Sequence, residues 1–228
     1  MKTAFSFYIE RLFVVTYYKT VEHYGLSEIV IKKSRFLGHA KPVESEEEAV
    51  RFVEAIRKEH GSATHNCFAY VIGERDQIQK QSDDGEPSGT AGKPILEVIK
   101  NQGLKNAAVV VTRYFGGIML GAGGLIRAYT DGAVAGIEAA EPIYMVHHAK
   151  VRIEIDYTWY GKLENELRSK GTKLGETLFT DKVIVTCYPI AAEAEGFVSW
   201  ITDVTQGQSG IAVEQSEYIK HKELPWGH

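Results

Sequence analysis

The chain has 228 residues, of which 44% are hydrophobic and 25% are charged, as in ordinary globular proteins. This composition excludes a chain that is disordered over most of its length, and the length suits one large domain or two small ones. The net charge is −4, and residues 1–140 carry 17 basic and 17 acidic side chains while residues 141–228 carry 9 and 13. Neither part has the basic excess of a typical nucleic-acid binder, so contact with RNA would have to rest on a local patch.

Residues 1–23 are an N-terminal extension whose status the sequence leaves open. Residues 1–18 are aromatic and apolar, but Glu10 and Arg11 interrupt them and no small-residue cleavage site follows, which disfavours a secretory signal. No apolar run approaches the ~20 residues that span a bilayer. We therefore expect a cytoplasmic protein without a membrane partner, in which Cys67 and Cys187 are reduced, buried and inert. The alternative for these cysteines is a disulfide or a catalytic thiol.

The first predicted domain covers residues 24–145 and mixes strands with helices. Ser45 followed by three glutamates predicts a helix start, because a serine cap and acidic side chains favour the amino end of a helix. The apolar run 107–112 is typical of a central strand that is covered on both faces. The predicted strands are 28–33, 36–40, 67–72 and 107–112, the helices are 46–60, 95–102 and 123–140, 81–94 is a polar loop, and Pro142 marks a break.

The second predicted domain covers residues 146–220, and residues 221–228 form a tail. The predicted elements are a strand at 149–157, a helix at 159–170, strands at 175–179 and 183–188, a helix at 192–205 and a last strand at 211–219. This β-α-β-β-α-β order is typical of a ferredoxin-like sandwich. The expected fold class is therefore α+β.

A glycine-rich segment begins where Arg113 closes the buried strand 107–112 and ends in the helix that carries Arg127. Glycine permits a ligand to approach backbone N–H groups, and the first turn of a helix has unbonded donors and a positive dipole end. With the two arginines this segment suits an anion such as a phosphate, a nucleotide or an RNA backbone. It matches neither the P-loop pattern nor the dinucleotide-binding fingerprint. Tight chain packing explains the glycines equally well, so both interpretations stay open.

An acidic segment brings Asp83, Asp84 and Glu86 within four residues. These carboxylates suit a hard cation such as Mg²⁺ or a general acid/base pair, and Asp84-Gly85 with Pro87 suits an acidic turn. The spacing does not fit the calcium-loop pattern, and Ser88 is not in the G-x-S-x-G context of a hydrolytic nucleophile. We expect no bound metal and no cofactor.

His65 precedes a predicted strand and has no histidine or cysteine partner at zinc-binding spacing. It is interpreted as a hydrogen-bonding anchor for a loop, with proton transfer or RNA contact as the alternative.

Three motifs together resemble the YigZ/IMPACT family over residues from about 24 to 145. They are Thr64-His65-Asn66-Cys67, the run Asp83-Asp84-Gly85-Glu86-Pro87-Ser88-Gly89-Thr90-Ala91-Gly92, and Arg113-Tyr114-Phe115-Gly116-Gly117 continued by Leu120-Gly121-x-Gly123-Gly124-Leu125-x-Arg127-Ala128-Tyr129. The long middle run makes the resemblance specific. Met119 carries no charge, whereas a lysine there would strengthen an anion site.

The resemblance implies a first domain with the fold of ribosomal protein S5 domain 2 and a ferredoxin-like second domain similar to the last domain of elongation factor G. Eukaryotic relatives are linked to translational control under amino-acid starvation, through binding a large ribosome-associated activator of a kinase. Fold analogy does not by itself establish function.

We expect a non-catalytic binding protein linked to translation or its regulation under stress, since the residues complete neither a metal cage nor a nucleophile with its base. Its partner would be RNA, the ribosome or a translation-associated protein, and the oligomeric state is left open. The expected binding face comprises His65, Asn66, Asp84, Glu86, Ser88, Thr90, Arg113, Tyr114, Gly116, Gly117, Gly121, Gly123, Gly124, Arg127 and Tyr129. The alternatives are an enzyme that uses Asp83–Glu86 with His65, for example a hydrolase or a phosphate-handling enzyme, and a protein–protein adaptor.

Overall fold

The computed structural model describes residues 15–226, so the first 14 residues of the expected extension and the last two of the expected tail lie outside it. The chain divides into two compact units. The first is built on Tyr18–Tyr144 and the second on Met145–Lys220.

The first unit contains a five-stranded antiparallel sheet with the order β2-β3-β6-β4-β5. Its strands are β2 (Gly25–Ile31), β3 (Ser34–Pro42), β4 (His65–Ile72), β5 (Ile78–Ser82) and β6 (Ala107–Tyr114), and its helices are α2 (Glu46–Glu59), α3 (Gly92–Asn101) and α4 (Ala122–Ala139). The helix predicted at 46–60 is confirmed, and Ser45 Oγ accepts the Glu48 N–H at 3.2 Å.

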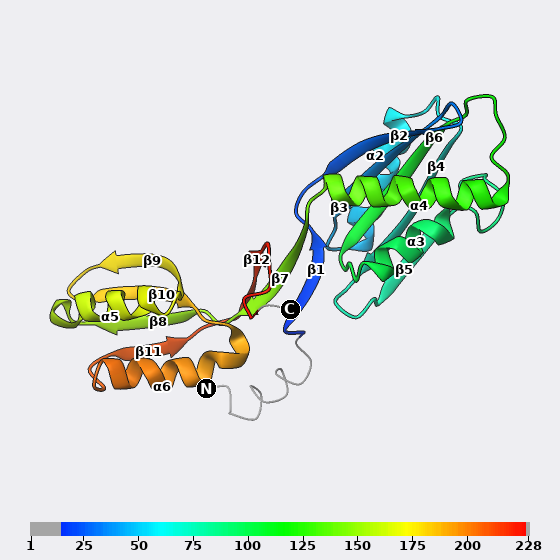
Figure 1. Cartoon of the computed structure of the whole chain (residues 1–228). Helices are drawn as coiled ribbons and strands as arrows, with labels where there is room; N and C mark the ends of the chain where they lie inside the picture. Colours follow the sequence, from blue (N-terminus) through cyan, green and yellow to red (C-terminus); the bar gives the residue numbers. More distant parts are fainter. Residues whose placement is uncertain (1–14, 227–228) are drawn as a thin grey trace. The chain divides into compact units, whose positions relative to one another are not determined.

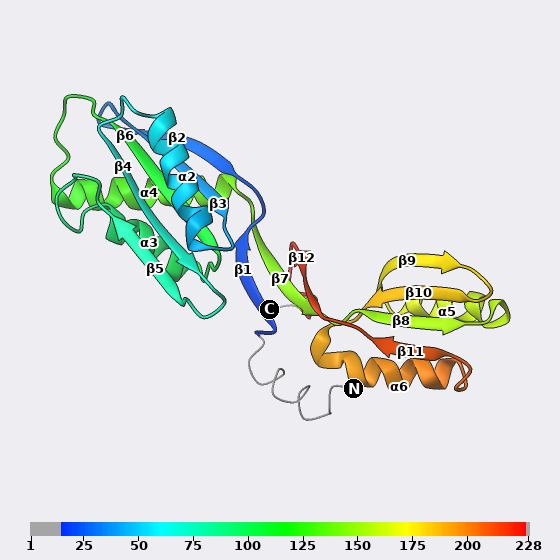
Figure 2. The ribbon, with the colours of Figure 1, turned by 180° about the vertical axis from the view of Figure 1, so that it is seen from behind.

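Helices cover both faces of this sheet. Helices α3 and α4 lie over one face and α2 over the other, as Figures 1 and 2 show from opposite sides. Alternate residues of the middle strand enter different cores, with Val109 and Val111 on the α3/α4 side and Ala108 and Val110 on the α2 side. The prediction of a central strand covered on both faces is therefore confirmed.

Two sequence predictions in this unit are wrong in detail. The strand predicted at 28–33 ends at Ile31, because Lys32 and Lys33 form the hairpin turn between β2 and β3 with φ angles of 45° and 68°. The polar loop expected from Gln81 begins only after Ser82, since Ile78–Ser82 is β5. This edge strand pairs through its backbone with β4 while most of its side chains face solvent, so no apolar pattern marks it.

A separate three-stranded sheet has the order β1-β7-β12 and contains β1 (Tyr17–Val21), β7 (Pro142–His148) and β12 (Glu217–His221). Pro142 begins β7 just after the end of α4, and proline is tolerated at the first position of a strand because the missing N–H is not needed there. The strand predicted at 211–219 is two strands, β11 (Gly210–Val213) and β12.

The second unit has the predicted order of elements: β8 (Val151–Ile155), α5 (Tyr157–Ser169), β9 (Lys173–Phe179), β10 (Val183–Tyr188), α6 (Ala194–Val204) and β11. Its antiparallel sheet has the order β11-β8-β10-β9. Inward-facing residues of β8 and β10, such as Val151, Ile153 and Val185, form one core with Leu163 and Leu167 of α5 and Phe197 and Ile201 of α6. The expected βαββαβ succession is confirmed.

Candidate functional site

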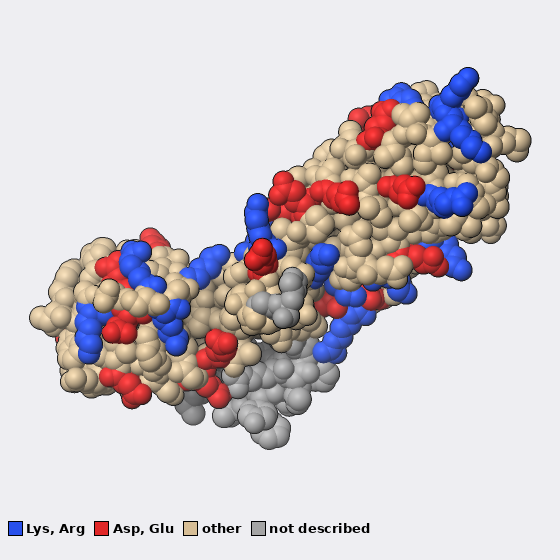
Figure 3. Space-filling view, in the orientation of Figure 1, with Lys and Arg blue, Asp and Glu red and all other residues tan. Residues whose placement is uncertain are grey.

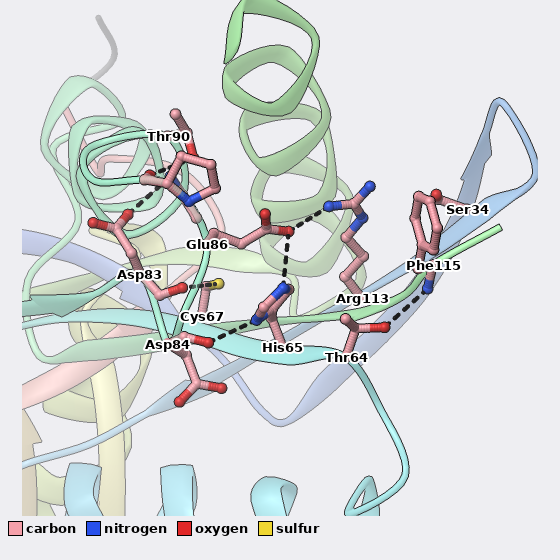
Figure 4. A network of polar contacts seen from close by, with 12 residues as sticks. Ser34, Thr64, His65, Cys67, Asp83, Asp84, Glu86, Thr90, Arg113 and Phe115 are labelled. Carbon is pink, nitrogen blue, oxygen red and sulfur yellow. Dashed lines mark hydrogen bonds and ion pairs between the residues drawn. The ribbon is translucent and has the colours of Figure 1, made fainter. Parts of the chain in front are cut away.

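Asp83 organises the acidic loop between β5 and α3. Its carboxylate accepts the backbone N–H groups of Gly89, Ala91 and Gly92 at 2.8 to 3.0 Å. Figure 4 shows the Asp83 side chain within the surrounding network of polar contacts. Burial raises the pKa of this carboxyl group, but the three N–H bonds outweigh burial and lower the pKa below its usual value. Because α3 has no side-chain cap at its N-cap residue, Asp83 supplies the missing acceptor from a distance in sequence.

Asp84 joins the same loop to β4 and α2. Its Oδ2 accepts the Asn66 N–H at 2.6 Å, and its Oδ1 accepts Arg57 Nη2 at 2.8 Å. The Asp84 carbonyl accepts His65 Nδ1 at 2.7 Å, so His65 makes the loop-anchoring contact anticipated from the sequence. Asp84 and Gly85 both have positive φ, 45° and 88°, which turns the chain sharply at this point.

Glu86 and Arg113 form an ion pair in the interior. Their side chains are 4% and 7% exposed, and Glu86 Oε1 accepts both Arg113 Nη1 and the Tyr129 hydroxyl, the latter at 2.8 Å. His65 Nε2 lies 3.9 Å from the same oxygen. Arg113 was expected to add fixed charge to an anion site, but its charge is balanced inside the protein by a residue of the acidic loop.

Cys67 lies under this network and is buried. Its Sγ is 2.9 Å from the Asp83 carbonyl oxygen, and burial raises the pKa of the thiol far above its usual value. Burial also raises the pKa of the Tyr129 hydroxyl. At neutral pH both groups therefore stay protonated and act as hydrogen-bond donors, which is the inert state expected for this cysteine.

Other residues of the expected face are also bonded internally. Their contacts are Thr90 Oγ1 to the Pro87 carbonyl at 2.6 Å, Thr112 Oγ1 to Asn66 Oδ1 at 2.7 Å, and the Tyr114 hydroxyl with His60 Nδ1 at 2.9 Å. Ser88 is exposed. The acidic loop and the strand ends thus form a bonded scaffold, and most of its polar atoms are already occupied.

The glycines of the loop between β6 and α4 serve different purposes. A Cβ on Gly116 would lie 2.1 Å from the Lys33 carbonyl carbon, and one on Gly124 would lie 3.1 Å from Leu120 Cβ, so both permit close packing. Gly117 and Gly121 have positive φ, 81° and 70°, with no atom within 4 Å of an added Cβ. Gly123 has neither a positive φ nor a close neighbour, so its backbone is simply open.

The first turn of α4 is open to an anion. It has no acidic residue and no side-chain cap, and its first bonded amide is that of Leu125, which donates to the Gly121 carbonyl at 2.9 Å. Within residues 15–226 no acceptor is assigned to the amides of residues 122–124. Arg127 is exposed, and among the described residues it forms no assigned hydrogen bond or ion pair.

The hairpin turn of β2 and β3 lies at the same end of the sheet as this helix start. Packing of Ala140 on Gly25, Gly132 on Gly38 and Tyr129 on Phe36 fixes the direction of α4 along the hairpin, so its first turns approach the Lys32–Lys33 turn. The Gly116 N–H also donates to Ser34 Oγ at 3.1 Å, which holds the loop against the turn. Figure 3 shows basic side chains gathered at this end of the unit.

Several residues here are not part of the binding face expected from the sequence. Lys32 and Lys33 are exposed, and in the described part of the chain neither has an assigned ion pair. Phe115 is 49% exposed above the Arg113 guanidinium, 5.4 Å from ring centre to Cζ, and Met119 is 85% exposed. We call the surface formed by Lys32, Lys33, Phe115, Met119, Arg127 and the amides of residues 122–124 the loop face. The two lysines were a detectable signal, since they stand between alternating segments where a hairpin turn belongs.

No group of three or more His, Cys, Asp or Glu side chains in residues 15–226 is arranged to hold a metal ion. No described helix is both long and apolar enough to cross a membrane.

A pair of histidines lies on the α2 side of the sheet. His39 is fully buried, its Nδ1 is 2.9 Å from the Tyr24 hydroxyl, and its ring centre is 5.1 Å from that of His60. His39 Nε2 has no partner among the described groups. Burial, with a smaller contribution from His60, lowers the pKa of His39 to about 4.

We predict that His39 makes the first unit sensitive to acid. Its pKa in the folded state lies below that of the unfolded chain, so its contribution to stability is complete above about pH 6.5. Between about pH 6.5 and 4 the unfolded chain takes up a proton that the folded chain does not bind, and the free energy of unfolding should fall by roughly 3 kcal/mol. Urea unfolding at several pH values measures this fall. The variant His39→Leu should flatten the curve in this interval, and an unchanged slope would contradict the assignment.

The chain matches two family models: the Impact N-terminal domain over residues 32–137 and a domain of unknown function, DUF1949, over residues 153–208. IMPACT family member YvyE of Bacillus subtilis is 49% identical over 206 residues, which cover 89% of this chain and 94% of that protein. IMPACT family member YigZ of Escherichia coli is 49% identical over 104 residues, 45% of this chain and 51% of that protein. Protein IMPACT of Mus musculus is 37% identical over 98 residues, 41% of this chain and 30% of that protein.

A solved structure described as a hypothetical protein is similar to this chain, with a TM-score of 0.57 and 29% identity. The similarity covers 89% of this chain and 99% of the solved one. The similarity extends over most of the chain and both of its domains, and is not confined to a single motif. The chain belongs to the IMPACT family.

Proposed function

We propose that this protein is a non-catalytic binding protein of the translation apparatus or of its regulation under stress, which contacts RNA or the ribosome through the loop face. The link to translation rests on the family resemblance, and the choice of surface rests on the residues described above. A cytoplasmic location belongs to the same proposal.

The folds implied by the resemblance are part of this proposal. The succession β8-α5-β9-β10-α6-β11 and the sheet order β11-β8-β10-β9 support a ferredoxin-like second domain, with boundaries near residues 146 and 220. For the first domain, near residues 24–145, we infer the fold of ribosomal protein S5 domain 2. Both inferred folds occur in proteins that work on the ribosome, which is an analogy and supports the proposal only in that sense.

The Lys32–Lys33 turn is the main reason for choosing the loop face as the binding surface. Two-residue hairpin turns of this kind favour Asn-Gly, because positive φ costs an ordinary side chain about 1–2 kcal/mol. Both lysines adopt this conformation, with φ of 45° and 68°, and neither forms an ion pair with another described residue. Unfavourable backbone conformations persist where they serve function. The function that we infer for this turn is to hold two ammonium groups beside the unbonded amides in the first turn of α4.

The remaining groups of the loop face suit the same ligand. Free amides at a helix start and a nearby arginine bind phosphate oxygens. Phe115, supported from below by Arg113, offers a ring on which a nucleotide base can stack. The neighbouring scaffold gives the enzyme hypothesis less support, because Asp83, Asp84, Glu86 and His65 are already bonded to protein groups.

A titration with a fluorescent RNA oligonucleotide, together with ribosome co-sedimentation, tests the proposal. The variant Lys32→Gln/Lys33→Gln/Arg127→Gln should lose about tenfold or more in affinity, because each lost phosphate contact removes a counterion-release contribution. A matched variant, Lys58→Gln/Lys93→Gln/Lys100→Gln, removes the same charge from α2 and α3 and should bind like wild type. Equal losses in both variants would indicate non-specific attraction and contradict the loop face. If wild type binds neither RNA nor ribosomes, the proposal fails and the adaptor hypothesis takes its place.

A further inference from the structure

The second unit carries an exposed cluster of aromatic rings at one end. The cluster consists of Tyr157, Tyr160 and Phe179, and Tyr157 and Phe179 are 52% and 59% exposed. The Phe179 ring centre lies 6.4 Å from that of Tyr157 and 5.5 Å from that of Tyr160, which it meets edge to face. Large aromatic side chains that are both clustered and exposed are typical of the centres of protein interfaces.

Tyr160 is half-buried and packs against the core of the unit, whereas Tyr157 and Phe179 lie outside the core. Phe179 is the last residue of β9 and pairs with Val183, whose side chain is buried, but Phe179 itself lies beyond the core cluster. The Tyr157 hydroxyl donates to the Thr180 carbonyl at 2.7 Å and so joins the first turn of α5 to the β9–β10 turn. The rings are therefore held in place before any ligand arrives, which reduces the entropy lost on binding.

The charged groups around the cluster are mainly acidic. Lys182 Nζ is 3.0 Å from Glu154 Oε1 and also experiences the charges of Asp156 and Asp181. On the other side, Tyr160 is bonded to Glu164, whose carboxylate pairs with Arg168 Nη2 at 2.8 Å. Glu154 and Glu164 are paired with cations, and the carboxylates that flank the Tyr157–Thr180 contact in the chain are those of Asp156 and Asp181, both exposed.

We propose that this surface binds an arginine-bearing segment of a protein partner. A guanidinium group stacks on the face of a Tyr or Phe ring and donates paired hydrogen bonds to carboxylates, so it satisfies both features of the surface at once. A lysine ammonium is more strongly hydrated and stacks less well. A nucleic acid would also stack on the rings, but the local negative charge repels its phosphates.

This inference does not depend on the proposed function of the loop face. The loop face is basic and lies in the first unit. The aromatic cluster lies in the second unit and is flanked by carboxylates. Each surface is tested with its own ligand and its own variants, so that failure at one leaves the other standing.

The test is a titration of the full chain against a fluorescein-labelled peptide that alternates arginine with Gly-Ser, with lysine and glutamate versions as controls. Wild type should bind the arginine peptide, bind the lysine peptide roughly threefold less tightly, and show no binding to the glutamate peptide. The variants Phe179→Ser and Asp181→Asn should each weaken arginine-peptide binding roughly fivefold. Two matched exposed substitutions, Val213→Ser on β11 and Asp203→Asn on α6, should leave it unchanged.

Asp181→Asn removes only an exposed carboxylate, so it reports on binding even if Phe179→Ser perturbs the fold. Equal arginine-peptide affinity in wild type and Asp181→Asn, or no binding by wild type, would overturn the proposal. Sedimentation equilibrium provides a second check. A dimer of the chain that dissociates in Asp181→Asn would assign the surface to a second copy and would likewise overturn the proposed partner.

Discussion

Replacing Glu86 with alanine is expected to destabilise the first unit by about 3–5 kcal/mol, the usual cost of leaving one charge of a buried ion pair without its partner. Glu86 Oε1 accepts both Arg113 Nη1 and the Tyr129 hydroxyl, and the two charged side chains are 4% and 7% exposed. Without Glu86 the guanidinium stays buried beside a hydroxyl that has lost its acceptor. Urea denaturation followed by circular dichroism measures the loss.

A double-mutant cycle separates the ion pair from the packing of its side chains. Glu86→Leu/Arg113→Met replaces both charges with apolar groups of similar length and should cost much less than either single substitution, because no uncompensated charge remains. The exposed pair of Glu28 and Arg35, 38% and 51% exposed, provides the control, and Glu28→Ala should cost at most about 1 kcal/mol. Similar losses for Glu86→Ala and Glu28→Ala would contradict the structural role given to the buried pair.

The second large effect is expected from Gly116→Ala, which should destabilise the first unit by about 2 kcal/mol. An added Cβ would lie 2.1 Å from the Lys33 carbonyl carbon and 2.2 Å from its oxygen, and backbone atoms cannot move aside as a flexible side chain can. The loop would have to separate from the hairpin turn and lose the bond from Gly116 N–H to Ser34 Oγ. We therefore expect weaker RNA binding as well as lower stability.

Gly123→Ala is the matched control, and its effect on stability should have the opposite sign. Gly123 lies in the first turn of α4 with no atom within 4 Å of an added Cβ. Alanine is favoured over glycine in helices, so this variant should be more stable by up to about 1 kcal/mol. Thermal melts of the two variants measure the difference. If Gly116→Ala melts at or above the temperature of Gly123→Ala, the loop does not pack against the turn as described.

Much of the fold is predictable from local patterns. Ser45 with its three glutamates identifies the start of α2, and the apolar run of β6 identifies the middle of the sheet. The predictions fail where backbone pairing or turn geometry, and not the pattern of side chains, determines the local structure. The polar strand β5 is held through its hydrogen bonds to β4, and the Lys32–Lys33 turn contains residues that rarely adopt positive φ.

The candidate site was only partly predictable, because burial is a long-range property. The sequence identifies Arg113 and Glu86 as polar residues near glycines, but 27 positions separate them in the chain. Pairing of β4 with β6, which sets His65 opposite Arg113, brings the acidic loop over the arginine. No local pattern reveals this pairing. Conversely, Lys32 lies in none of the three motifs, and Phe115 is an apolar residue of the third motif. The exposure of both side chains becomes apparent only in the folded structure, where the loop packs against the turn.

The salt dependence of RNA affinity tests the loop face most directly. The logarithm of the affinity of a single-stranded oligonucleotide falls with the logarithm of salt concentration by roughly 0.7 for each neutralised phosphate. If Lys32, Lys33 and Arg127 each neutralise one phosphate, the slope for Lys32→Gln/Lys33→Gln/Arg127→Gln should be shallower than that of wild type by about 2. Parallel lines for the two proteins would mean that these three cations do not contact the ligand, and the central claim would be wrong.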